Sequence, residues 1–134
     1  MSTSKIIYKN NLRTEAQHIA SGQKVITDAP LDNNGKGEAF SPTDLVATAL
    51  ASCMITIMAI AAEKNGINIS ETSASVKKIM GTNPRTISDI VIEIKMSKDL
   101  ALKDRNRIEK AALACPVHKS LHPDMNKKIT FIYV

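Results

Sequence analysis

Aromatic residues are scarce in this sequence. Its 134 residues include no tryptophan, two tyrosines and two phenylalanines, and no run of cationic residues is longer than the pair Lys77–Lys78. Proteins that bind nucleic acid need a basic stripe or aromatic side chains on which bases can stack. We therefore expect no nucleic-acid partner, although the formal net charge is +5.

Cysteine is also rare. Two cysteines, Cys53 and Cys115, are too few for a scaffold held by disulfides. The opening residues, MSTSKIIYKNN, lack the apolar stretch of a secretion signal. Hydrophobic residues make up 43% of the chain and charged residues 23%, which is an ordinary globular composition. These features predict a cytoplasmic protein with a single domain over residues 1–134.

Short apolar runs between turn residues predict most of the secondary structure. Before residue 28, the runs KIIYK, RTEAQHIA and QKVIT are separated by turn residues, which is typical of a meander of short strands. Further along, alternating residues predict two long strands, and spacings of three and four predict a helix. The expected elements are a strand hairpin over 68–80 and 85–96, a second helix over 99–114 ended by Pro116, and a final strand over 128–134.

A turn-rich loop leads into the longest apolar stretch. Residues 28–40, DAPLDNNGKGEAF, predict a loop of about a dozen residues with a binding or lid role. A helix then follows over 41–65, where Ser41 and Asp44 form a capping box. Residues 45–62 carry no charge, but there is no second span and no aromatic belt, so we expect a helix buried on all sides and no membrane partner. One small sheet covers only one side of such a helix, which predicts a homodimer. The whole order of elements predicts an α+β fold.

Cys53 and Cys115 are the strongest candidates for chemistry. Either both are small core residues, or they are a redox pair in which one thiolate reduces an oxidant and the second closes a disulfide. The reacting thiol has to ionise near neutral pH and needs a cationic partner, for which Arg13 is the best-placed arginine. A different hypothesis uses Cys115, His118 and His122, whose spacing Cys-x2-His-x3-His presents three zinc ligands.

The segment SPTDLVATALASCMITIMAIAAEKNGI, followed further along by CPVHKSL, resembles the OsmC/Ohr family of osmotically inducible and organic hydroperoxide resistance proteins. The likeness extends over nearly the whole chain, because the order of elements around the two cysteines also matches. It implies an intertwined homodimer, in which sheets built from both chains wrap long central helices. It further implies reduction of organic hydroperoxides by a cysteine pair, with no metal, haem or flavin.

The resemblance also implies roles for individual residues. Cys53 would be the peroxidatic thiol and Cys115 the resolving thiol, at a site on the dimer interface, and a dithiol reductant such as a lipoyl group would regenerate the pair. Arg13 would stabilise the thiolate. The family's characterised peroxidases carry an acidic residue directly after the helix-opening proline, where this chain has Thr43 followed by Asp44, so both are candidate supporting residues.

The neighbours of Cys53 indicate the kind of substrate. Met54, Ile57 and Met58 are apolar, and an apolar surface beside the thiol would favour an organic over an inorganic peroxide. The alternative on the same fold is a protein that binds a small apolar molecule in its interface cleft. In that case the cysteines would be structural and would resist alkylation in the native protein.

Overall fold

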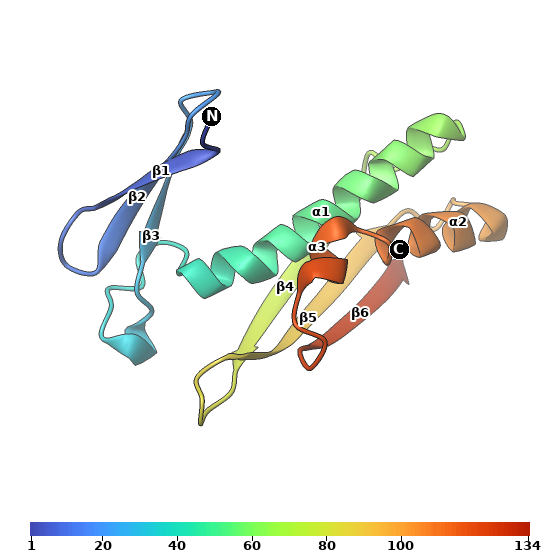
Figure 1. Ribbon diagram of the computed structural model, residues 1–134. Coiled ribbons are helices and arrows are strands. Elements are labelled where there is room, and N and C mark those ends of the chain that lie inside the picture. The colour runs from blue at the N-terminus through green and yellow to red at the C-terminus, as the bar shows by residue number, and fades with distance from the viewer. The chain divides into compact units, whose positions relative to one another are not determined.

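Three short strands form the first sheet. The computed structural model describes residues 1–134, and β1 (Ser4–Tyr8), β2 (Arg13–His18) and β3 (Lys24–Asp28) pair in that order, antiparallel throughout (Figure 1). The turn between β1 and β2 holds Asn10 and Asn11 at positive φ angles of 68° and 55°. The predicted meander is confirmed.

The chain divides into two compact units, Met1–Val46 and Ala47–Val134. The first holds the meander and the loop that follows it, and the second holds the other sheet and the helices packed on it. The single domain over residues 1–134 stays a prediction.

After β3 the chain forms a tight loop that contains a short 3-10 helix, η1 (Leu31–Asn33). The N–H of Asp28 donates to the carbonyl of Phe40 at 3.0 Å, so the two ends of the loop lie together. Inside the loop, a Cβ added to Gly35 would lie 1.7 Å from the carbonyl oxygen of Ala29. Because no side chain fits at that separation, this fold of the loop requires glycine at position 35.

Gly35→Ala is expected to destabilise the loop by about 3 kcal/mol, because the backbone at Ala29 has to move away. Gly66→Ala is the matched control. Gly66 has a φ of +65° but nothing within 4 Å of the added Cβ, so we expect a cost of about 1 kcal/mol. Urea unfolding and limited proteolysis between residues 29 and 40 measure the difference, and equal costs for the two variants would contradict the prediction.

The long helix α1 (Pro42–Lys64) begins at the predicted capping box. The N–H of Asp44 donates to Ser41 Oγ, and the N–H of Ser41 donates to Asp44 Oδ2, both at 3.0 Å. The helix ends just before Gly66, whose positive φ suits a helix terminus. The helix predicted over 41–65 is confirmed within a residue at each end.

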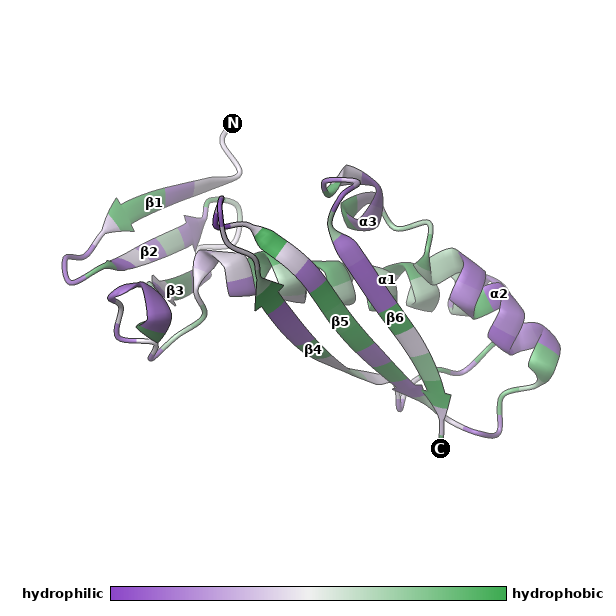
Figure 2. Ribbon diagram, turned by 90° about the horizontal axis from the view of Figure 1, so that it is seen from below, coloured by the Kyte–Doolittle hydropathy of each residue, from purple (hydrophilic) through white to green (hydrophobic).

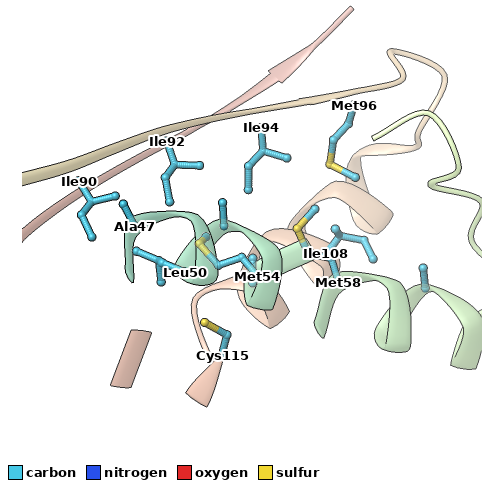
Figure 3. Close-up of a cluster of buried hydrophobic side chains, with 13 residues drawn as sticks. Ala47, Leu50, Met54, Met58, Ile90, Ile92, Ile94, Met96, Ile108 and Cys115 are labelled. Atoms are coloured by element: carbon cyan, nitrogen blue, oxygen red, sulfur yellow. The ribbon is translucent and has the colours of Figure 1, made fainter. Parts of the chain in front are cut away.

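The second sheet has the order β4 (Ser73–Met80), β5 (Ile87–Met96), β6 (Asn126–Tyr133). β4 and β5 form the predicted antiparallel hairpin, while β6 runs parallel to β5. Hydrophilic and hydrophobic residues alternate along β4 and β5 (Figure 2). The apolar side of β5 faces α1 (Figure 3), and its fully buried residues are Ile90, Ile92, Ile94 and Met96.

α1 is covered only in part in the single chain. Its buried residues are Ala47, Leu50, Ala51, Met54, Met58 and Ala62, whereas Val46 is 36% and Ile60 46% exposed. The open side agrees with the prediction that one sheet covers only part of this helix, and its burial by a second copy stays a prediction. By length and composition α1 could cross a membrane, but the core helix of a soluble protein passes the same test.

The helix predicted over 99–114 is present as α2 (Leu102–Ala112), and a short helix that was not predicted, α3 (Pro116–Ser120), follows it. Pro116 does not merely end a helix, as predicted, but begins α3 at a position where its missing N–H costs nothing. Cys115 lies between the two helices as the N-cap of α3, rather than at the end of the preceding helix.

Candidate active site

The two cysteines come together in the C-terminal unit. Cys53 lies midway along α1, is partly exposed and packs against the core, whereas Cys115 is fully buried at the start of α3. Cys115 lies on the side of α1 away from the sheet (Figure 3). The Cys53 side chain lies close enough to the Cys115 thiol to raise its pKa. Both are free thiols, so the structure is that of the reduced pair.

Burial raises the pKa of the Cys115 thiol above its ordinary value, and the Cys53 thiol adds to the increase. Backbone N–H groups of His118 and Val117 act in the opposite direction, because they donate to the sulfur and stabilise its charged form. The N–H of His118 lies 3.3 Å from Cys115 Sγ. Cys115 is therefore a protonated thiol in the resting protein, with donors already aimed at its sulfur.

Arg13 lies in the N-terminal unit, where it is held by two carboxylates. Its Nε donates to Asp28 Oδ1 at 2.7 Å and its Nη2 to Asp28 Oδ2 at 2.8 Å, and Nη2 also donates to Glu38 Oε1 at 3.2 Å. The side chain of Asp28 is 1% exposed, and that of Arg13 is 33% exposed. The action of Arg13 on Cys53 stays a prediction, and its established contacts are these two carboxylates.

The Arg13–Asp28 pair makes the meander sensitive to acid. Hydrogen bonds from Arg13 hold the pKa of Asp28 below its ordinary value, against the opposing effect of burial. A carboxyl group with a lowered folded-state pKa stabilises the fold above its unfolded pKa of about 3.9, and that stabilisation is lost as the pH falls through the folded-state value. We therefore expect the protection factors for hydrogen exchange in residues 13–28 to fall at pH below about 4.

Asp28→Asn should produce the same loss of protection already at neutral pH. Asp124→Asn, which alters a side chain that is 91% exposed, is the control and should leave protection factors in residues 13–28 unchanged. Protection factors in wild-type protein that stay constant from neutral pH to pH 2 would contradict the prediction.

Thr43 and Asp44 make hydrogen bonds that stabilise the first turn of α1. Asp44 completes the capping box, and Thr43 Oγ1 lies 3.1 Å from Ser41 Oγ. These contacts explain why a short acidic residue stands three positions after Ser41. A supporting role for either residue in thiol chemistry stays a prediction.

The proposed zinc ligands do not converge. No three His, Cys, Asp or Glu side chains in the chain form a group able to hold a metal ion. His118 contacts Cys115 through its backbone N–H, and burial followed by the charge of Lys127 lowers the pKa of its imidazole. His122 is exposed and its Nδ1 accepts the N–H of Asp124 at 3.1 Å. The zinc hypothesis therefore has no geometric basis.

The three apolar residues predicted to border Cys53 have different positions. Met54 and Met58 are fully buried in the core between α1 and the sheet (Figure 3). Ile57, one turn beyond Cys53, is partly exposed and packs at the edge of the core. Of the three, Ile57 alone is placed to contact a molecule that approaches Cys53.

Known structures share this arrangement over the whole chain. A Psychrobacter arcticus 273-4 protein ascribed to the osmotic stress induced and detoxification response is 50% identical, with a TM-score of 0.94 over 98% of this chain and 96% of that one. An OsmC-like protein from Mycoplasma pneumoniae is 17% identical, with a TM-score of 0.77 over 98% and 94% of the two chains. The organic hydroperoxide resistance protein OsmC from Legionella pneumophila is 16% identical, with a TM-score of 0.73 over 98% and 96%.

No functionally curated protein matches the sequence closely enough to count as a relative. The sequence profile of OsmC-like proteins, in contrast, matches residues 35–130, which include both cysteines and every element from α1 to α3. The two segments whose sequence resembles this family, the one that opens α1 and CPVHKSL, both lie within the matched residues. The chain therefore belongs to the OsmC-like protein family.

Proposed function

We propose that this protein is a cytoplasmic thiol-dependent peroxidase that reduces organic hydroperoxides through Cys53 and Cys115. The observation that carries the proposal is the interaction of the two thiols, one partly exposed and one fully buried. Hydroperoxide resistance proteins from Legionella pneumophila and Elizabethkingia anophelis have the same fold and support the choice of substrate class.

In the proposed reaction the Cys53 thiolate attacks the distal oxygen of the hydroperoxide. The O–O bond breaks, Cys53 becomes a sulfenic acid, and the alkoxide leaves and takes a proton to form an alcohol. Cys115 then attacks the sulfenic sulfur, which releases water and closes the disulfide. A dithiol reductant, for which a lipoyl group is our candidate, restores both thiols and becomes a disulfide itself. Arg13 would stabilise the thiolate and the charge on the leaving oxygen.

The burial difference between the sulfurs supports this division of roles. A peroxide has to reach the first sulfur from solution, and of the two only Cys53 is partly exposed. The second sulfur has to reach only its partner, so full burial is no obstacle for Cys115. The buried thiol is also protected from overoxidation, since susceptibility follows exposure and thiolate character.

The first test is the intact mass and free-thiol count after one equivalent of cumene hydroperoxide, with hydrogen peroxide in parallel. We expect both thiols to disappear with the loss of two hydrogens, faster with the organic peroxide. Two thiols that survive cumene hydroperoxide would overturn the proposal. The fold would then have been retained without peroxidase chemistry, and small-molecule binding would become the function to test.

We also propose that the active protein is a homodimer. The uncovered side of α1 exposes Val46 and Ile60, and the meander exposes Ile6, Ile7 and Tyr8, which are 64%, 47% and 59% accessible. Apolar surface of this extent is typical of an interaction site. Light scattering on the eluting protein should give twice the chain mass of 14.6 kDa. A single-chain mass at micromolar concentration would contradict the dimer.

A further inference from the structure

The two sulfurs of the pair are not equivalent targets for a second thiol. Cys115 is 0% exposed, whereas Cys53 is partly exposed on α1. Thiol–disulfide exchange requires the attacking sulfur to approach the target sulfur in line with the bond that breaks. An external thiol therefore has a path to Cys53 and none to Cys115.

The surroundings of Cys115 suit a sulfur that receives negative charge. Its Sγ accepts the N–H of His118 at 3.3 Å, and the backbone N–H of Val117 also lowers its pKa. These donors are fixed by the backbone at the start of α3, where Cys115 is the N-cap. A thiolate released at this position meets hydrogen-bond donors that need no rearrangement.

We propose that reduction of the Cys53–Cys115 disulfide is directional: the reductant thiolate attacks Cys53 Sγ, and Cys115 is the leaving thiolate. This inference rests on the proposed peroxidase function. In the step, the bond between the reductant sulfur and Cys53 Sγ forms, the Cys53–Cys115 bond breaks, and its electron pair moves to Cys115 Sγ, which then takes a proton. The second thiol of a dithiol reductant displaces Cys53, which restores both cysteines and oxidises the dithiol.

The acidity of Cys115 and the accessibility of the two sulfurs favour opposite directions of attack by the reductant. Burial raises the pKa of Cys115, which would slow its departure, because thiols of lower pKa leave faster. The two contributions of Cys53 to that increase disappear once Cys53 is bound in a mixed disulfide, whereas the backbone donors remain. The difference in access is not offset in this way, since a sulfur with no exposed surface can be attacked only after the protein opens locally. Access therefore decides the direction.

The experiment determines which cysteine carries the reductant. Wild-type protein is oxidised with diamide, which forms the disulfide without any peroxide, and is then mixed with excess glutathione, quenched in acid after short times, and mapped by peptide mass spectrometry. We expect at least about tenfold more glutathione on Cys53 than on Cys115 at the earliest times. Equal labelling, or an excess on Cys115, would overturn the inference.

Single-cysteine variants provide the matched control. In native Cys115→Ser the remaining Cys53 should react quickly with dithiobis(nitrobenzoate), and in native Cys53→Ser the remaining Cys115 should react at least about tenfold more slowly, with equal rates in denaturing urea. Equal native rates would also overturn the inference. If the diamide disulfide opens at Cys53 but cumene hydroperoxide leaves both thiols intact, the directional step stands and the peroxidase function fails. If diamide forms no disulfide, both fail.

Discussion

Cys53→Ser is expected to abolish hydroperoxide turnover. A serine hydroxyl is far less acidic and less nucleophilic toward peroxide oxygen than a thiolate, so we expect kcat/KM for cumene hydroperoxide to fall by at least about a thousandfold. The substitution preserves the size of the side chain and its place at the edge of the core, so the fold should be unaffected. Consumption of hydroperoxide in the presence of dihydrolipoamide measures the effect.

Two further variants test whether the loss of turnover is due to the Cys53 thiol itself. Ser52→Ala alters an exposed neighbour on the same helix and should retain wild-type turnover. Cys115→Ser should still oxidise once, so dimedone should label Cys53 as a sulfenic acid, but no disulfide should form. Substantial turnover by Cys53→Ser would mean that Cys53 is a core residue and that the reaction occurs elsewhere.

Arg13→Lys is expected to lower kcat/KM for the hydroperoxide by about a hundredfold. Lysine keeps the positive charge but has no planar guanidinium that can bind Asp28 through two nitrogens and still present a further donor. If Arg13 stabilises the Cys53 thiolate and the leaving oxygen, loss of this geometry reduces the rate even when the protein remains folded. Initial rates normalised to the folded fraction measure the effect.

Asp28→Asn distinguishes the two possible roles of Arg13. It weakens the hold on the guanidinium but leaves Arg13 charged, so we expect a reduction in rate of less than about tenfold together with a clear loss of stability. Arg85→Lys, in the exposed turn between β4 and β5, should change neither quantity. If Arg13→Lys and Asp28→Asn both reduce stability and neither affects the normalised rate, Arg13 is a structural residue of the meander alone.

Local sequence signals predicted the elements well. The meander, the capping box at Ser41 and the hairpin before Met96 depend on alternation, turn residues and helix caps, all of which act over a few residues. The short helix α3 was not predicted. Pro116 fits the first turn of a helix as well as the residue after a helix end, and the neighbouring residues do not distinguish the two.

The contacts of the site depend on pairings that a pattern does not display. Asp28 was not predicted as a partner of Arg13, although a turn centred between His18 and Lys24 sets these two residues opposite each other in the β2–β3 register. The backbone donors at Cys115 required knowledge of where α3 begins.

The position of β6 has a consequence for local unfolding. This strand pairs with β5 along its whole length, and Tyr133 near its end donates a hydrogen bond of 2.6 Å to Glu109 on α2. When β6 detaches, β5 gains an unpaired edge and α2 loses this contact. Opening of one strand therefore exposes the edge of a long apolar strand, which can pair with another chain and begin aggregation.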